Sequence, residues 1–198
     1  MTHAPLILAS ASAARRAMLE NAGVAFQVQV ADVDEGAVKA RFDAARAAEL
    51  AQELAAAKAL AVSERTPGAW VLGGDQTLAF DGALISKAPD LGAARARLSA
   101  MRGRPHQLHS GAALARDGRV LWSGVDTATM QVRDFSDGFL DAYLAAEGTA
   151  LLACVGSYRL EGLGSQLFDR IDGDYFTVLG LPLWTVLDQL RRHGVIAA

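Results

Sequence analysis

The segment from Val71 to Gly82, VLGGDQTLAFDG, constrains the fold of this chain more than any other. A run of bulky apolar residues stops at two glycines, Asp75 follows, and a second apolar run leads into Asp81-Gly82. The apolar runs predict buried strands, and the Asp-Gly pair predicts a hairpin turn. Asp75 is therefore expected at the C-terminal end of a buried strand, where α/β folds place their ligands.

The rest of the chain alternates strand patterns with helix patterns. Ser12 is expected to cap the first helix and Gly23 to end it, and FQVQV alternates like a half-buried strand. The expected helices cover residues 12–23, 36–61 (as one helix or two), 90–103, 136–148 and 181–194, and the expected strands cover 6–10, 26–30, 70–74, 77–85 and 106–132. Because hairpins and helical crossovers both occur, we expect an α/β fold with a mixed sheet, in one domain over residues 1–198.

Composition excludes several kinds of partner. The 198 residues are 52% hydrophobic and carry a net charge of −3, so the chain has no general attraction for nucleic acid or anionic membranes. The one cysteine, Cys154, excludes an internal disulfide, and no apolar run is long enough for a membrane span. The N-terminus lacks the basic region of a signal peptide. We expect a soluble, cytoplasmic protein that holds anionic ligands with local clusters of Lys and Arg.

Common ligand motifs give little further information. The chain has no P-loop, and EGLGSQL at 161–167 starts like a dinucleotide fingerprint but lacks its third glycine. His106 and His109 are three residues apart in an expected strand, so they point to opposite faces and do not form a joint metal site. We expect His106, Cys154 and Trp184 to be structural, with the tryptophan in the core.

Charged residues at the ends of apolar segments remain as candidates. Ser10 and Arg15 lie where a strand passes into a helix N-terminus, which is either a phosphate site or a capped helix with solvated arginines. Lys58 and Lys87, taken alone, fit surface lysines. Asp75 is suited to ligating a metal or taking a proton from water, or it is a turn aspartate; the apolar run before it favours function.

Seven segments taken together resemble the Maf family of nucleoside triphosphate pyrophosphatases over nearly the whole chain. They are LILASASAARRAMLENAGV, ADVDE, AAAKA, GGDQTLAFDGALISKAPD, MRGRPHQLHSGAAL, VGSYRLEGLG and GDYFTVLGLPL, in the family's order. The resemblance implies hydrolysis of a nucleoside triphosphate to the monophosphate and pyrophosphate, with a divalent cation, Mg²⁺ or Mn²⁺. It also implies a Maf/ITPase-like fold of two lobes around a central mixed sheet, a nucleotide cleft between the lobes, and a homodimer.

The resemblance also implies roles for individual residues. Asp75 takes the place of the family's acid, as the catalytic base or as a ligand of the metal. Glu35 is expected to hold the metal with Asp75. The expected phosphate-binding residues are Ser10, Arg15, Lys58 and Lys87. Water attack at the α-phosphorus requires the triphosphate charge to be offset, which the metal and the three cations would do.

Three positions depart from the family's commonest pattern and bear on the base. Ala14, Gln76 and Glu161 stand where the branch that hydrolyses dTTP and UTP typically has Arg, Thr and Gln. Gln76 and Glu161 instead resemble the branch that acts on 7-methyl-GTP. Methylation at N7 makes guanine cationic, and a Glu161 carboxylate would offset that charge, although it would also bind ordinary GTP. That branch often has a bulky aromatic at the position of Ala14, so a stacking surface would be lost.

Functions of other classes remain as alternatives. The family has been associated with septum formation, which suggests a nucleotide-binding regulator of cell division with little turnover. The retained acid at Asp75 argues against this, because a binding protein would not need it. Nucleic-acid binding has little support, since the net charge is −3 and no ladder of aromatic and basic residues occurs.

Overall fold

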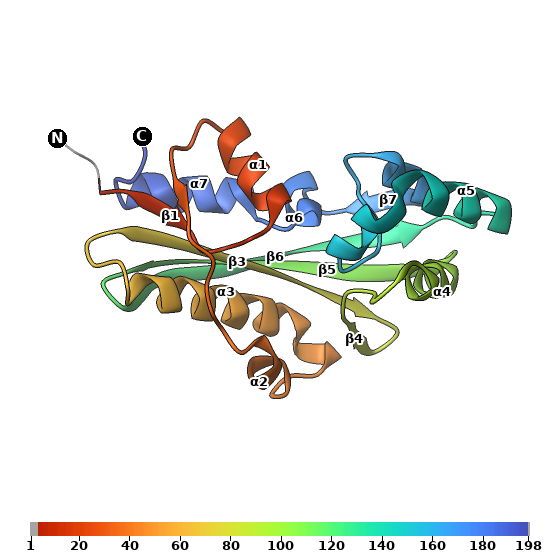
Figure 1. Ribbon diagram of the computed structural model, residues 1–198, viewed down its shortest axis with the longest axis horizontal. Coiled ribbons are helices and arrows are strands. Elements are labelled where there is room, and N and C mark those ends of the chain that lie inside the picture. Colours follow the sequence, from red (N-terminus) through yellow and green to blue (C-terminus); the bar gives the residue numbers. More distant parts are fainter. Residues whose placement is uncertain (1–3, 198) are drawn as a thin grey trace.

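The computed structural model describes residues 4–197, which form an elongated α/β structure around a mixed sheet of seven strands (Figure 1). The strands are β1 (Leu6–Leu8), β2 (Gln27–Val28), β3 (Trp70–Phe80), β4 (Ala83–Ile85), β5 (Pro105–Arg116), β6 (Arg119–Val132) and β7 (Phe168–Asp172). Their order is β2-β1-β3-β5-β6-β7, and β4 pairs with β3. β1 is parallel to β2 and β3, and the remaining pairs are antiparallel, as predicted for a mixed sheet.

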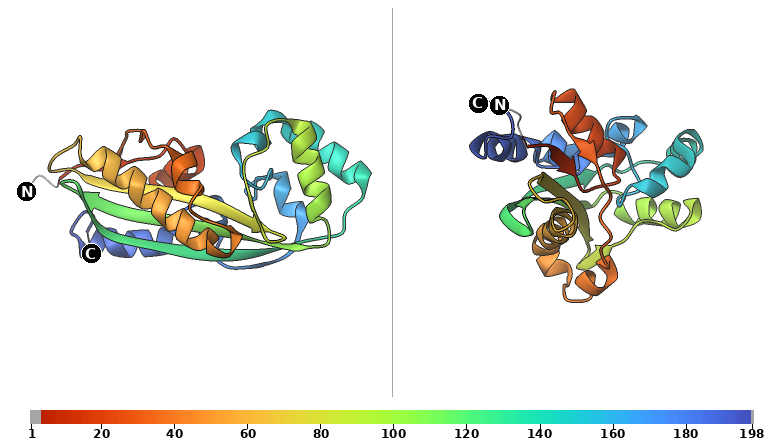
Figure 2. Two further views of the ribbon diagram at one scale, coloured as in Figure 1. Left: turned by 90° about the horizontal axis from the view of Figure 1, so that it is seen from below. Right: turned by 60° about the vertical axis from the view of Figure 1, so that its left-hand side comes forward.

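Helices cover both faces of this sheet. The α-helices are α1 (Ala13–Asn21), α2 (Glu35–Lys39), α3 (Ala47–Ser63), α4 (Leu91–Met101), α5 (Asp137–Glu147), α6 (Tyr175–Leu179) and α7 (Leu183–Arg192), and the 3₁₀ helices are η1 (Ala44–Arg46), η2 (Gly148–Ala153) and η3 (Leu163–Leu167). Figure 1 shows α1, α6 and α7 on one side of the long strands and α3 on the other. Figure 2 shows α4 and α5 grouped at one end of the elongated molecule. The cap predicted at Ser12 forms, and Asp90 caps α4 in the same way, because each side chain accepts a backbone N–H of the helix that follows.

The molecule has two lobes with separate hydrophobic cores. In the first lobe, Leu72 and Leu114 pack with α1 and α7 on one face of the sheet, and Val71 packs with alanines of α3 on the other. In the second lobe, Leu78 and Leu108 pack with residues of α4 and α5. The long strands therefore take part in both cores, and their middle portions lie between the lobes.

Glycines in β3 and β5 let helix α3 lie directly on the sheet. A Cβ added at Gly73 would lie 2.1 Å from the carbonyl oxygen of Ala55, and one at Gly111 would lie 2.3 Å from that of Ala51. Any side chain at these positions would push the helix away. This close approach explains why the helix is rich in alanine, and it brings Lys58 of α3 over β3.

The prediction that a strand ends at the two glycines is wrong. β3 runs without interruption from Trp70 to Phe80, so Asp75 lies in its middle and not at its end. The glycines serve close packing and do not turn the chain. The predicted hairpin after them is correct: β4 pairs antiparallel with β3, and Asp81 and Gly82 have φ angles of 53° and 75°, as a tight hairpin turn requires.

Other local predictions are also wrong. FQVQV forms only the two-residue β2, whose Val28 is 46% exposed because β2 is the outermost strand of the sheet. Trp184 is not a core residue but is 64% exposed on α7. β7 and α6, each five residues long, are elements that the sequence did not predict. Within residues 4–197, no helix combines the length and the apolar character that a membrane span needs.

Candidate active site

In the described part of the chain, the middle of β3 has no partner strand on one edge, which we call the bare edge. β1 pairs with Trp70–Leu72 and β4 pairs with Leu78–Phe80, so no strand of the described chain pairs with residues 73–77 on that edge. On the other edge β5 continues past this stretch, and Asp75 lies opposite Gly111. Backbone N–H and C=O groups in such a gap are available to a ligand. Asp75 therefore lies beside a gap in the sheet, between the C-terminal ends of β1 and β4.

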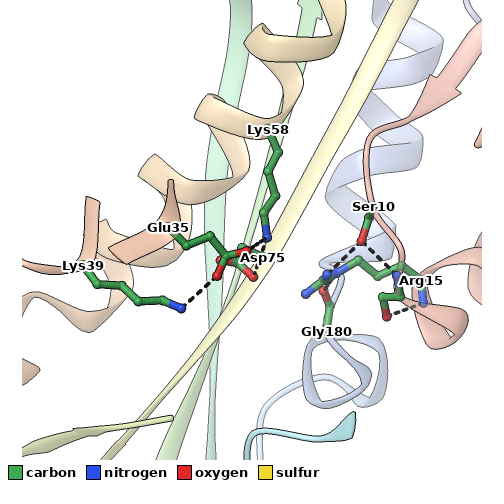
Figure 3. A network of polar contacts seen from close by, with 8 residues as sticks. Ser10, Arg15, Glu35, Lys39, Lys58, Asp75 and Gly180 are labelled. Atoms are coloured by element: carbon green, nitrogen blue, oxygen red, sulfur yellow. Dashed lines mark hydrogen bonds and ion pairs between the residues drawn. The ribbon is translucent and has the colours of Figure 1, made fainter. Parts of the chain in front are cut away.

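Two carboxylates meet at one lysine beside this gap (Figure 3). The Nζ of Lys58 lies 2.7 Å from an oxygen of Glu35 and 3.3 Å from Oδ1 of Asp75. The Lys58 and Asp75 side chains are each 14% exposed, and that of Glu35 is 39% exposed. Lys39, four residues after Glu35 on α2, lies 2.8 Å from its second oxygen. Solvent screens the Lys58–Asp75 pair less than an exposed pair, so this contact positions both groups firmly.

The two lysines make Glu35 a stronger acid. Partial burial by itself would raise the pKa of the Glu35 carboxyl, but hydrogen bonds and charge from Lys39 and Lys58 outweigh burial and lower the pKa to about 2. Glu35 is therefore ionised throughout the neutral range and presents a negative charge at the gap.

Glu35 and Asp75 fit a hard divalent cation. Both have an oxygen within 3.3 Å of the Lys58 ammonium, so they converge on a point where positive charge is already favoured. Carboxylate oxygens are the ligands that Mg²⁺ and Mn²⁺ prefer. Residues 4–197 contain no group of three or more His, Cys, Asp or Glu side chains that would hold a metal unaided. A cation here would depend on water and substrate oxygens for its other ligands, as Mg²⁺ commonly does at phosphate sites.

Arg15 lies on the opposite face of β3. Gly74 makes room for it, since a Cβ there would lie 3.1 Å from Cδ of Arg15. The arginine is only 8% exposed; its Nε donates to the carbonyl of Gly180 at 2.6 Å, and Nη1 donates to Oγ of Ser10 at 3.1 Å. Figure 3 shows Arg15 and Ser10 across β3 from the Asp75 cluster. The predicted pair of Ser10 and Arg15 is thus a direct contact.

Acids across the strand stabilise this buried cation. Burial lowers the pKa of the Arg15 guanidinium, and the charges of Asp75 and Glu35 oppose that effect. The two faces of β3 are therefore coupled electrostatically, although their side chains point in opposite directions.

Gln76 is anchored by helix α6. Its Nε2 lies 3.1 Å from both Oγ of Ser110 and the carbonyl oxygen of Thr177, and 3.0 Å from the carbonyl oxygen of Val178. Ser110 also donates to the Thr177 carbonyl at 2.7 Å, and Asp174 caps the start of α6. The segment GDYFTVLG therefore builds a short helix whose carbonyls orient Gln76. The amide oxygen of Gln76 is the group that remains to accept a hydrogen bond from a ligand.

The other three predicted site residues lie on other elements. Ala14 is half-buried in the first turn of α1. Lys87 is exposed on the loop between β4 and α4, and Glu161 is 36% exposed on the turn before η3. Burial raises the pKa of the Cys154 thiol, the charge of Glu161 adds to the rise, and that of Lys87 opposes it. The charges of Lys87 and Glu161 therefore both reach the Cys154 thiol, in the same part of the second lobe.

Comparison with known proteins now identifies the family. A family model described as Maf-like protein matches residues 5–193. The chain belongs to the Maf family. A Caulobacter vibrioides relative named nucleoside triphosphate pyrophosphatase is 51% identical over 198 residues, which is 99% of each chain. A Granulibacter bethesdensis relative of the same name is 53% identical over 193 residues, 96% of this chain and 98% of the relative. A Brucella suis relative named 7-methyl-GTP pyrophosphatase is 48% identical over 193 residues, 96% of this chain and 97% of the relative.

Sequence reasoning missed several supporting groups in this Maf protein. Lys39 carries a local signal, because it follows Glu35 at the four-residue spacing of helical ion pairs. Ser110 and Gly180 carry none, since one is a strand serine and the other contributes a backbone carbonyl. Their roles come from the packing of α6 against β3 and β5, which no local pattern records.

Proposed function

We propose that this Maf protein is a nucleoside triphosphate pyrophosphatase that acts on 7-methyl-GTP or a closely similar nucleotide. It would release the nucleoside monophosphate and pyrophosphate and so remove non-standard nucleotides. The meeting of Asp75, Glu35 and Lys58 at the bare edge of β3 is the observation that carries the proposal. The names of relatives about half identical to this chain, nucleoside triphosphate pyrophosphatase and 7-methyl-GTP pyrophosphatase, support the reaction class.

The proposed reaction needs a base beside the α-phosphorus. Water attacks that phosphorus, and the bond from it to the oxygen that bridges to the β-phosphorus breaks. The Asp75 carboxylate takes the proton of the water, and pyrophosphate leaves with the bridging oxygen. Lys58, 3.3 Å from Asp75, holds the carboxylate in place and offsets charge on the phosphates.

The remaining cations are assigned to the triphosphate. Ser10 and Gly180 orient Arg15 before any ligand arrives, and we assign its third guanidinium nitrogen, Nη2, to a phosphate oxygen. Lys87 would approach the phosphates from the second lobe. Glu35 and Asp75 would hold the divalent cation, which supplies further neutralisation of phosphate charge when bound.

The base would be recognised by side chains from both lobes. Gln76 offers its amide oxygen from β3, and Glu161 offers a carboxylate to a cationic methylated guanine. Arg159 lies 3.4 Å from Glu161 and also 3.4 Å from Glu147, so it balances two acids at the base site. Ala14 leaves space in the first turn of α1 where a larger residue would restrict the base.

Pyrophosphate release from a panel of nucleotides tests the proposal. The panel contains 7-methyl-GTP, GTP, dTTP, UTP, CTP and ATP with Mg²⁺ or Mn²⁺, and Asp75→Asn is assayed beside the wild type. We expect a preference for 7-methyl-GTP and a loss of about 10³-fold or more in Asp75→Asn, with nucleotide binding retained. A preference for dTTP or UTP keeps the reaction and refutes the proposed base recognition. No release from any nucleotide favours a binding regulator of cell division.

Two further parts of the proposal have separate tests. We place the protein in the cytoplasm, and cell fractionation checks this location. We also propose a homodimer, and size-exclusion chromatography with light scattering measures its mass in solution.

A further inference from the structure

Arg97 connects two loops of the second lobe. Its side chain extends from α4 and is half-buried. Nη1 donates to the carbonyl of Val155 at 2.7 Å and to the hydroxyl of Ser157 at 3.2 Å, while Nη2 donates to the carbonyl of Ser86 at 2.5 Å. One rigid, planar guanidinium therefore sets the spacing between two segments that are far apart in the chain.

Both of these loops carry residues of the proposed ligand site. Ser86 immediately precedes Lys87, which is assigned to the phosphates. Ser157 lies a short turn before Glu161, which is assigned to the base. Ser157 is fully buried and has a φ of 59°, a conformation that non-glycine residues rarely adopt and that surrounding contacts must maintain. The hydrogen bond from Arg97 is one such contact.

The environment of Arg97 differs from that of two nearby arginines. Arg95, two residues earlier, forms an exposed ion pair with Asp141, and Arg102 pairs with Asp137. The acceptors of Arg97 are two carbonyls and a hydroxyl, all uncharged, and burial lowers the pKa of its guanidinium. A lysine would offer one nitrogen in place of the two that reach different loops. The fork of the arginine is therefore the feature that this position uses.

We propose that Arg97 is a positioning residue that sets the distance between Lys87 and Glu161. The separation of these two residues then corresponds to the distance between the triphosphate and the guanine of one nucleotide. This inference rests on the proposed function. Asp75, Lys58 and Glu35 are held by β3, α3 and α2, none of which supplies a hydrogen-bond partner to Arg97. Loss of Arg97 should therefore weaken substrate binding more than the chemical step.

The test compares Arg97→Met with Arg95→Met, a matched control on the same helix. Hydrogen–deuterium exchange should become faster in both loops, residues 86–88 and 155–161, in Arg97→Met alone. With 7-methyl-GTP, KM should rise about tenfold or more while kcat stays within about threefold, because the contacts of Lys87 and Glu161 with the substrate weaken while Asp75 and Lys58 keep their places. The preference for 7-methyl-GTP over UTP should also fall. Thermal unfolding of both variants checks that they remain folded.

Several results would overturn this inference. Unchanged exchange in either loop means that Arg97 does not join them. Faster exchange with unchanged KM and base preference means that the contact only stabilises the fold. Full recovery of KM in Arg97→Lys refutes the need for two nitrogens. A wild-type protein that releases no pyrophosphate overturns the proposed function and the role in substrate binding, whereas the exchange result still decides whether Arg97 joins the loops.

Discussion

The two faces of β3 hold their site residues by different means. On the α3 face, Asp75 is held by charge, through an ion pair with Lys58 that extends to Glu35. On the α6 face, Arg15 and Gln76 are held mainly by uncharged carbonyls and hydroxyls around α6 and β1. The alternation of side chains along a strand separates these sets by a single residue.

This difference corresponds to two tasks in the proposed reaction. Ion pairs can exchange partners when a metal or a phosphate arrives, because a new charge replaces the old one. Hydrogen bonds to backbone carbonyls of a packed helix cannot be exchanged so readily, and they keep a side chain in one orientation. The α3 face is therefore suited to the reaction, during which the charges around Asp75 change. The α6 face is suited to binding the nucleotide with side chains that keep one orientation.

Among the variants that compare the two faces of β3, the largest expected effect follows from removing the shared cation of the α3 face. Lys58→Met should lower kcat/KM for pyrophosphate release by about 10²-fold or more, since the variant leaves two acids without the ammonium between them. Steady-state kinetics at saturating Mg²⁺ measures this loss. Activity within threefold of the wild type would mean that charge does not organise this face.

Alanine at each of the two glycines compares the packing of the two faces. Gly73→Ala should destabilise the fold by about 3 kcal/mol or more, because its methyl group would meet the backbone of α3, which cannot move alone. Gly74→Ala should cost about 1 kcal/mol, because its methyl group would lie 3.1 Å from Cδ of Arg15 and a side-chain shift of a few tenths of an ångström relieves that contact. Urea denaturation gives both free energies of unfolding. Equal losses would show that the backbone of α3 is no more rigid than the Arg15 side chain.

Gln76→Glu tests the fixed character of the α6 face. The variant replaces the Nε2 donor with a carboxylate oxygen that faces the carbonyls of Thr177 and Val178, and we expect a loss of about 2 kcal/mol in the free energy of unfolding. Gln76→Met is the control, since it removes the donor without adding charge and should cost less. Chemical denaturation near pH 8 compares the two. A neutral effect of Gln76→Glu would contradict the anchoring of Gln76 by α6.

The smallest expected effect is that of Lys39→Met, which also serves as the matched control for Lys58→Met. Both lysines contact Glu35, but the Lys39 side chain is 45% exposed and that of Lys58 is 14% exposed. Exposed ion pairs contribute about 1 kcal/mol or less, so stability and kcat/KM should change little. The same denaturation and kinetic assays apply. A large loss would place Lys39 in the site itself.

Elements with local signals were predictable from the sequence. Ser12 and Asp90 cap helices because their side chains bond to backbone groups three residues later. The long hairpin of β5 and β6 turns at Asp117-Gly118, where φ angles of 50° and 71° suit these residue types. Each of these features depends on neighbours within a few positions, so the chain records them directly. The prediction missed β7 and α6, although α6 carries a cap of the same kind, in which the Asp174 side chain accepts the backbone N–H of Thr177.

The location of Asp75 was only partly predictable. Its residue type and its place after two glycines marked it as a candidate, and the family resemblance gave it a partner set. The sequence did not reveal that β3 continues through it, or that β1 and β4 both end beside it, one on either side. The roles of the site residues, the metal and a single domain over residues 1–198 stay predictions.

The sequence by itself determined the fold class, the family, and the types of charged residue available for the site. Only the tertiary structure decided that Glu35, Lys58 and Asp75 meet, from three elements, and that Gln76 is held by a helix about a hundred residues later. Secondary structure and caps follow from interactions between near neighbours in the chain. A site of this kind depends on glycines that admit α3 to the sheet and on where partner strands end, which are properties of contacts between distant segments.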